Sequence, residues 1–161
     1  MKYAVTGHTS GIGKKLYERL YPNIIGFSRS NGYNLNSYEN RQRIIAEVSD
    51  CDVFINNAHD GFSQTILLLE LFLVWKNENK IIINVGSKVS EITLPETRYD
   101  LLQYQSQKLI LKEMSSRLLG TCKVKYKYFG YVGTEKILKK YPDLKPTQYI
   151  SEDLAVDILL S

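Results

Sequence analysis

The sequence predicts an α/β protein in which a doubly wound parallel sheet of about six strands is covered by helices on both faces. Short apolar segments of strand length alternate with longer segments whose apolar residues follow the helical period. Residues 80–87 form a continuous Ile- and Val-rich run, which is typical of a buried parallel strand. A glycine cluster separates the first strand from the first helix. The length of 161 residues fits a single domain over residues 1–161.

The first strand covers residues 3–5 and runs into the loop Thr6-Gly7-His8-Thr9-Ser10-Gly11-Ile12-Gly13. The helix after it has apolar residues at helical spacing, at Ile12, Leu16 and Leu20. Gly7 allows a sharp turn, Gly11 a close approach of backbone to a pyrophosphate, and Gly13 tight packing of helix on sheet. Backbone N–H groups at the helix N-terminus favour phosphate binding, although such a loop on its own can also be a plain turn. The candidate cofactor-binding residues here are Gly7, Thr9, Ser10, Gly11, Ile12 and Gly13.

The second strand is expected at residues 23–27 and ends at Ser28-Arg29-Ser30. In a dinucleotide-binding fold this position faces the ribose 2′-hydroxyl, where an acid selects NAD and an arginine accommodates the 2′-phosphate of NADP. The acid is absent, so Ser28, Arg29 and Ser30 predict NADP, with a solvated loop arginine as the alternative. The next segment, 34–36, leaves room for only a short third strand. We count its Asn34 and Leu35 among the candidate cofactor-binding residues.

Two helices flank the fourth strand, which is expected at residues 52–59. Ser37 begins the first helix, whose buried residues are Ile44, Ile45 and Val48. The strand ends in the small and polar residues Asn56-Asn57-Ala58-His59, at the edge of the sheet where ligands collect. The second helix, from about Ser63 to Asn77, is apolar around nearly its whole circumference. This predicts burial against the sheet and against a partner surface, such as a homodimer through residues 66–75.

The fifth strand, residues 80–87, ends at Ser87. A polar loop then leads to a long helix from about Tyr99 to Leu119, which places Tyr104 and Lys108 on one face. In the sixth strand, residues 122–128, lysines alternate with less polar residues, so we expect an edge strand that resists intermolecular pairing. A loop over 129–134 precedes a short helix after Thr134. Ser151 caps a last helix through Leu160.

The composition argues against several classes of protein. The longest apolar run, residues 66–75, is too short for a membrane span, and the chain starts with a strand rather than a signal peptide. We therefore expect a cytoplasmic protein without a membrane partner. Cys51 and Cys122 are isolated, which predicts buried thiols and no metal site. The positive charge is scattered without a basic run, so no nucleic-acid partner is expected.

Five motifs in this order resemble those of the short-chain dehydrogenases/reductases, over nearly the whole chain. Residues 6–13 match the TGxxxGIG loop, 56–58 the NNA motif, and 83–87 the strand that ends in the active-site serine. Tyr104-x-x-x-Lys108 matches the family's tyrosine and lysine pair, and Gly130-x-Val132-x-Thr134 its PGxVxT loop. The resemblance implies a Rossmann-type sheet, here without the family's seventh strand.

The resemblance also implies carbonyl reduction or alcohol oxidation by hydride transfer with NADP (NADPH). Ser87 would orient the substrate oxygen and Tyr104 would act as acid/base. Lys108 would lower the pKa of the tyrosine and hydrogen-bond the nicotinamide ribose. Taken alone, this Tyr and Lys pair could be an ordinary surface pair. The cofactor-binding residues that match the family are Asn57, Ala58, His59, Tyr104, Lys108, Gly130, Val132 and Thr134.

Several departures from the family pattern leave alternatives open. His59 stands in place of glycine and Phe129 in place of proline, and the segment from Ser87 to Tyr104 is longer than usual. The segment from Asn57 to Ser87 is much shorter, so the family's catalytic asparagine has no assigned position. His8 and His59 are expected in loops that meet at the cofactor. The alternatives are a non-catalytic NADP-binding sensor or scaffold and a reduced relative of sugar-nucleotide epimerases.

Overall fold

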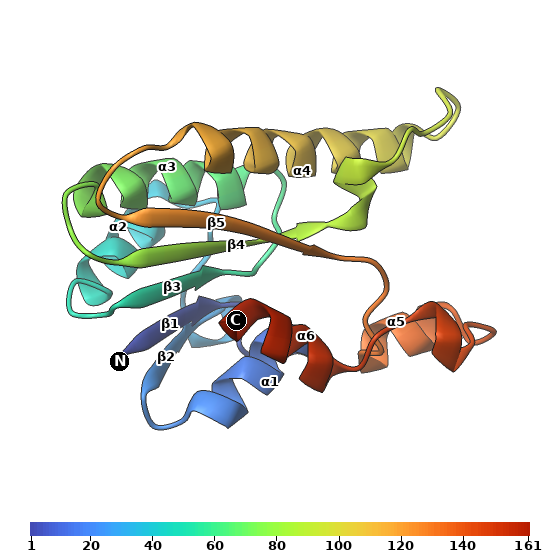
Figure 1. Cartoon of the computed structure of the whole chain (residues 1–161), viewed down its shortest axis with the longest axis horizontal. Helices are drawn as coiled ribbons and strands as arrows, with labels where there is room; N and C mark the ends of the chain where they lie inside the picture. Colours follow the sequence, from blue (N-terminus) through green and yellow to red (C-terminus); the bar gives the residue numbers. More distant parts are fainter.

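The computed structural model describes residues 1–161 and contains one parallel sheet of five strands in the order β2-β1-β3-β4-β5. The strands are β1 (Tyr3–Thr6), β2 (Ile24–Phe27), β3 (Val53–Asn56), β4 (Ile81–Ser87) and β5 (Lys123–Phe129). The strand order reverses between β1 and β3, so the chain winds outward from the middle of the sheet in both directions (Figure 1). This is the doubly wound α/β arrangement that the sequence predicts.

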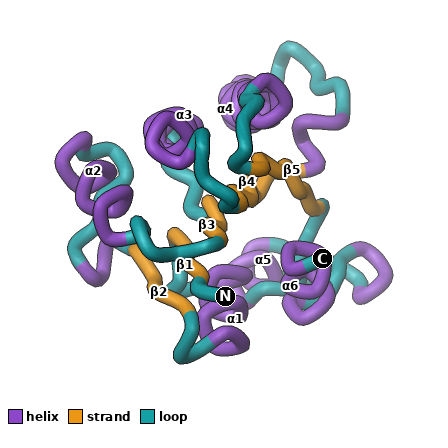
Figure 2. Tube along the Cα trace, turned by 60° about the vertical axis from the view of Figure 1, so that its left-hand side comes forward, coloured by secondary structure: helices purple, strands orange, loops and turns teal.

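The helices are α1 (Gly11–Leu20), α2 (Tyr38–Glu47), α3 (Ser63–Trp75), α4 (Tyr99–Arg117), α5 (Glu135–Lys140) and α6 (Glu152–Leu160). Figure 2 shows α2, α3 and α4 on one face of the sheet and α1 and α6 on the other. The predicted helix positions are therefore confirmed to within a few residues. No helix combines the length and the apolar character that crossing a membrane requires.

Two hydrophobic clusters lie on the two faces of the sheet, and neighbouring strand residues alternate between them. Ala4, Phe54 and Ile82 belong to the cluster beneath α2, α3 and α4. The residues that follow them in sequence, Val5, Ile55 and Ile83, belong to the cluster beneath α1 and α6. Both faces bury side chains, which explains why these strands are continuously apolar. Cys51 and Cys122 are buried free thiols, as predicted.

The short third strand expected at residues 34–36 is absent, and the segment is a turn. The Asn34 side chain accepts a hydrogen bond from the backbone N–H of Asn36 (3.0 Å), and the Asn34 carbonyl accepts one from Ser37 (3.0 Å). These local bonds compete with strand pairing, which is the usual effect of asparagine in such positions. Leu35 is nevertheless buried beneath the turn. The sheet therefore has five strands, close to the expected number of about six.

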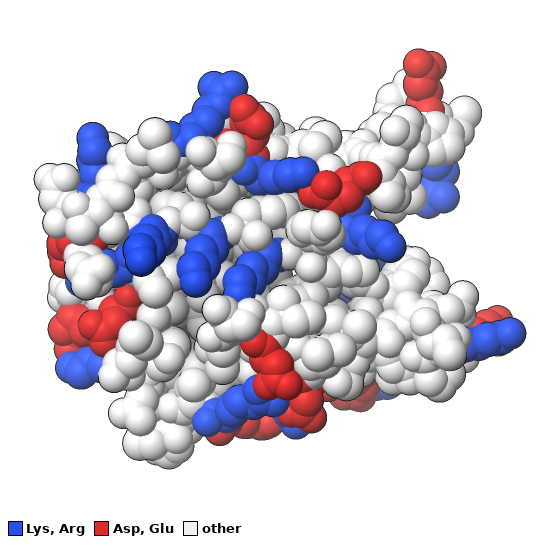
Figure 3. All heavy atoms as spheres, viewed as in Figure 1, with Lys and Arg blue, Asp and Glu red and all other residues white.

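β5 lies at the edge of the sheet, as its alternating lysines predict. It pairs with β4 alone, from Lys123 opposite Ile81 to Phe129 opposite Ser87. Basic side chains gather across the middle of the view in Figure 3, where β5 runs. Such charges on an exposed edge discourage pairing with another chain.

One side of α3 is buried and the other is exposed. Leu67, Leu68, Leu71 and Trp75 are fully buried, whereas Leu73 on the outer side is 76% exposed. The predicted burial against the sheet is confirmed. A homodimer through the outer side remains a prediction.

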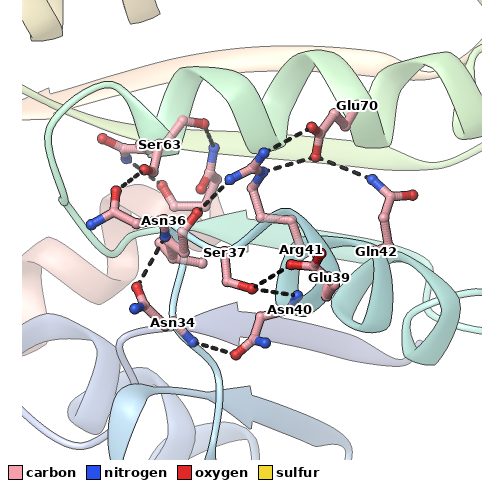
Figure 4. Close-up of polar contacts among 12 residues, drawn as sticks. Asn34, Asn36, Ser37, Glu39, Asn40, Arg41, Gln42, Ser63 and Glu70 are labelled. Carbon is pink, nitrogen blue, oxygen red and sulfur yellow. Dashed lines mark hydrogen bonds and ion pairs between the residues drawn. The ribbon is translucent and has the colours of Figure 1, made fainter.

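Polar side chains tie α2 to α3 and to the turn after β2 (Figure 4). Arg41, which is only 7% exposed, contacts both carboxylate oxygens of Glu70 (3.0 and 3.1 Å). It also donates to the Leu35 carbonyl (2.8 Å). The Ser37 hydroxyl accepts the backbone N–H of Asn40 (3.2 Å) and so caps α2. These contacts fix the segment that follows β2 relative to α3.

We expect Ser37→Ala to lower the free energy of unfolding by about 1 kcal/mol, because it removes this cap. Ser10→Ala is the matched control, since Ser10 stands at the N-cap of α1 without a side-chain cap hydrogen bond. Urea denaturation of the two variants should show the larger loss for Ser37→Ala. Equal losses would contradict the capping assignment.

Candidate functional site

The glycine loop turns sharply between β1 and α1, as predicted. Gly7 and Gly11 have φ values of +74° and +53°, which favour glycine. A Cβ on Gly13 would lie 2.0 Å from the Gly7 carbonyl oxygen, so only glycine permits this close packing. Beside Gly11 there is more space, and the nearest atom to an added Cβ is the Thr134 methyl at 3.5 Å. Because the Ser10 side chain forms no cap, its hydroxyl is available to a ligand at the start of α1.

Asn57 holds this loop in place through contacts with Thr6 and Gly7. Its side-chain amide donates to the Thr6 carbonyl (3.1 Å), and a Cβ on Gly7 would lie 3.1 Å from the same amide nitrogen. The Thr6 hydroxyl accepts from the backbone N–H groups of Asn57 (3.0 Å) and Ala58 (2.9 Å). The amide of Asn57 is thus committed to joining the ends of β1 and β3, and it positions the glycine loop.

Arg29 lies in a short 3₁₀ turn after β2 and forms an ion pair that the sequence analysis missed. Its guanidinium donates to Asp60 (2.5 Å), while Asn36 donates to the same carboxyl oxygen (2.9 Å). The hydroxyls of Ser28 and Ser30 form a hydrogen bond with one another (2.7 Å). An acid is therefore present beside the predicted 2′-phosphate site, supplied by the loop after β3 instead of the end of β2. Asp60 stands two residues beyond the NNA motif, but nothing in that position indicates Arg29 as its partner.

Ser87, Tyr104 and Lys108 come together at the carboxyl end of β4. Ser87 ends the strand, and its hydroxyl accepts the backbone N–H of Val89 (3.2 Å). Burial raises the pKa of Tyr104, and the nearby Ser87 hydroxyl opposes this only in part. The Lys108 ammonium lies 5.7 Å from the centre of the Tyr104 ring. In the free protein the lysine therefore does not bring the pKa of the tyrosine below its usual value.

The Lys108 ammonium forms its hydrogen bonds with other groups of the protein. It is 3% exposed, and its ammonium donates to the Gln64 side-chain oxygen (2.8 Å) and to the Val85 carbonyl (3.3 Å). Burial lowers the pKa of Lys108 to about 8. The role of Gln64 was not predicted from the sequence. The only sequence feature that could have pointed to it is its polar side chain on a strongly apolar helix.

The two histidines have different surroundings. The His8 ring contacts Tyr17 (centroids 5.0 Å apart) and occupies the space where Gly26 lacks a side chain. His59 packs edge-to-face on Tyr104, with ring centroids 4.8 Å apart. Partial burial, and secondly the charge of Lys108, lower the pKa of His59 to about 4. Only His59 therefore contacts the predicted catalytic residues.

The loop after β5 borders the glycine loop through Thr134. Thr134 caps α5 by accepting the backbone N–H of Ile137 (3.3 Å), and its methyl group faces Gly11. Val132 is buried and Gly130 is exposed. Phe129, which replaces the proline of the family motif, is buried in the core beneath α6.

We expect the pH dependence of stability to include a contribution from His59. Between about pH 4 and 6.5 the unfolded chain binds a proton that the folded histidine does not, so this contribution is complete above pH 6.5 and is lost as the pH falls. The difference in unfolding free energy between wild type and His59→Gln should therefore grow from pH 4 to pH 6.5. A constant difference over this window, measured by denaturant unfolding, would contradict the assignment.

Comparisons with known proteins agree with this arrangement. No protein-family model matches the sequence, and no curated protein matches it. Among solved structures, a short-chain dehydrogenase from Burkholderia cenocepacia in complex with NADP is similar, with a TM-score of 0.77 and 20% identity over 99% of this chain and 84% of that one. A small-chain dehydrogenase in complex with NADPH (TM-score 0.75, 15% identity) covers 99% of this chain and 89% of its own. For serine dehydrogenase complexed with NADP⁺ the TM-score is 0.76 and the identity 15%, over 99% of this chain and 88% of that one. The protein thus has the fold of the short-chain dehydrogenases/reductases.

Proposed function

We propose that this protein is an oxidoreductase that uses NADP(H) to reduce a carbonyl compound or to oxidise an alcohol. The observation that supports this most directly is the meeting of Ser87, Tyr104 and Lys108 at the edge of the sheet that also carries the glycine loop. The carboxyl ends of parallel strands are where open α/β sheets bind their ligands. The NADP and NADPH complexes of proteins with the same fold also support the proposal.

The residues around the glycine loop fit a dinucleotide. The loop has space beside Gly11, a free hydroxyl on Ser10, and the start of α1 facing any bound phosphate. Arg29 supplies a cation at the end of β2, and Lys108 supplies an ammonium next to Tyr104. When bound, the cofactor would donate or accept the hydride of the reaction.

The protein's own groups would handle the substrate oxygen and its proton. In our proposal the Ser87 hydroxyl hydrogen-bonds the substrate oxygen, and the Tyr104 hydroxyl delivers a proton as negative charge develops there. Its buried position raises the pKa of Tyr104 and keeps the hydroxyl protonated, as a proton donor requires. Lys108 would stabilise the tyrosinate that remains after the transfer, because an adjacent cation favours the charged form.

A non-catalytic NADP-binding protein is the second candidate, and one observation favours it. The Lys108 ammonium is bonded to Gln64 and Val85, and no lowering of the Tyr104 pKa accompanies it in the free protein. Turnover would therefore require Lys108 to act on the tyrosine only after ligand binding. A binding protein would have no such requirement.

We expect NADPH to bind at least about ten-fold more tightly than NADH, because charge-assisted hydrogen bonds from Arg29 to a 2′-phosphate contribute about 1.5–3 kcal/mol. Arg29→Ala should reduce this preference. Asp60→Asn is the matched variant, since it frees Arg29 of its carboxylate partner, and it should strengthen NADPH binding about two- to five-fold. Isothermal titration of both cofactors measures these effects, and a preference that survives Arg29→Ala would refute the assignment.

We expect Tyr104→Phe to reduce turnover about 10²–10⁴-fold with little change in NADPH affinity, because it removes only the proton donor. Lys108→Met should lower both turnover and cofactor affinity, since a cation next to the tyrosine and a cofactor contact are lost together. The substrate comes from a screen of carbonyl compounds for NADPH oxidation. Full activity of Tyr104→Phe would exclude the catalytic role. Tight NADPH binding without any substrate would favour the binding protein instead.

A further inference from the structure

Lys108 is a buried cation without an acidic partner. Its ammonium contacts two oxygen atoms, the side-chain oxygen of Gln64 and the backbone carbonyl of Val85. The other groups that face it are the ring of Tyr104 and the imidazole of His59, and neither supplies a negative charge. Burying an ammonium is costly unless hydrogen bonds replace its lost water. The two oxygen acceptors are therefore what allows the charge to remain in this position.

The orientation of the Gln64 amide is determined by its surroundings. Its nitrogen donates to the carbonyls of Asn56 (2.6 Å) and Val85 (3.0 Å), and a carbonyl oxygen can only accept. The amide nitrogen must face these two groups, so the amide oxygen is left facing Lys108. The Asn56 side chain also donates to the Gln64 backbone carbonyl (2.8 Å). Gln64 is 2% exposed, and it is held at both its backbone and its side chain.

We propose that Gln64 is a positioning residue for the oxidoreductase site, whose side-chain oxygen holds the Lys108 ammonium on the side of α4 that carries Tyr104. This inference rests on the proposed function, and it adds a residue from α3 to a site otherwise built from β4 and α4. Gln64 contacts no reacting group. It acts through Lys108.

A neutral amide suits this role better than a carboxylate. A carboxylate would pair with the ammonium in a buried ion pair, which is hard to separate once formed. A hydrogen bond to an uncharged amide is weaker, so Lys108 can exchange it for the hydroxyl groups of a ligand. The amide therefore favours the charged form of the lysine and still allows its release.

The alternative is that Gln64 serves only the stability of the fold. It belongs to a buried polar network in which Asn56 donates to Asn84 (2.9 Å) and Asn84 donates to the Ser115 hydroxyl (3.0 Å). Ser115 is also buried but forms no hydrogen bond with Lys108, and its hydroxyl donates to the Leu111 carbonyl (2.7 Å). Ser115→Ala is therefore a matched control that disturbs the same network away from the lysine.

The test follows the titration of Lys108 in the cofactor-free protein by NMR of its side-chain methylene, identified by the signal missing in Lys108→Met. The wild-type midpoint is expected near the lowered pKa of about 8. Gln64→Met, which removes the acceptor, should lower the midpoint by about 0.5–1 pH unit. Gln64→Glu, which adds a negative charge, should raise it by about one unit or more. Ser115→Ala should lower stability and leave the midpoint in place.

The pH profile of kcat/KM provides the second readout, because it reports groups of the free enzyme. In Gln64→Met its alkaline limb should move to lower pH by the same amount as the Lys108 midpoint, with no such movement in Ser115→Ala. If Gln64→Met does not fold, the proposal is tested with Gln64→Glu and with the hydrogen exchange rate of the wild-type Lys108 ammonium. An ammonium that is hydrogen-bonded to Gln64 exchanges its protons with solvent slowly. An unshifted midpoint in the variants, or an unprotected ammonium in the wild type, overturns the proposal. If the Lys108 midpoint shifts in the Gln64 variants but the protein does not bind NADPH, the contact between Gln64 and Lys108 is supported and the proposed function is refuted.

Discussion

The Lys108 ammonium is buried without a carboxylate, and much of the site is arranged around that constraint. Its acceptor on α3 can face it only because the carbonyls of Asn56 and Val85 engage the nitrogen of the same Gln64 amide. Those carbonyls stand near the ends of β3 and β4, which pair in parallel register. The position of the lysine thus depends on the sheet register and on the start of α3, and not on α4 alone.

The segment from the end of β3 into the first turn of α3, residues 57–64, connects this constraint to the other predicted functional groups. Asp60 pairs with Arg29, His59 packs on Tyr104, and Gln64 binds Lys108. Asn57, at the beginning of the segment, holds the glycine loop through Thr6. One short stretch of chain therefore contacts each part of the site. It is also where the sequence departs from the family pattern, with His59 in place of glycine and a shortened connection to β4.

The sequence was sufficient to predict those features that depend on backbone geometry. Continuous apolar runs identified the buried strands, and Gly13 could be assigned to close packing because only glycine avoids the Gly7 carbonyl. That Ser87 would meet Tyr104 was implied by the resemblance to the short-chain dehydrogenases/reductases and not by strand geometry. Long-range side-chain partners could not be found in this way. Asp60 and Gln64 belong to no recognised motif, and the Asn34 turn replaced a strand because a side chain competed with pairing.

In the free protein, each proposed ligand-binding group contacts another protein side chain, and a bound ligand could displace that contact. The Arg29 side chain is 71% exposed, and exposed ion pairs contribute only about 0–1 kcal/mol. The Tyr104 ring contacts an aromatic neighbour, and such a pair contributes about 0.5–1.5 kcal/mol. Lys108 donates to an uncharged amide, and a hydrogen bond with one charged partner contributes about 1.5–3 kcal/mol. A ligand that presents a phosphate to Arg29 offers a more highly charged acceptor there, and its hydroxyl groups would take the place of the Gln64 amide oxygen at Lys108. Its binding energy would then exceed the cost of separating the resting contacts, and the site would be assembled by the ligand on a framework that the buried network keeps fixed.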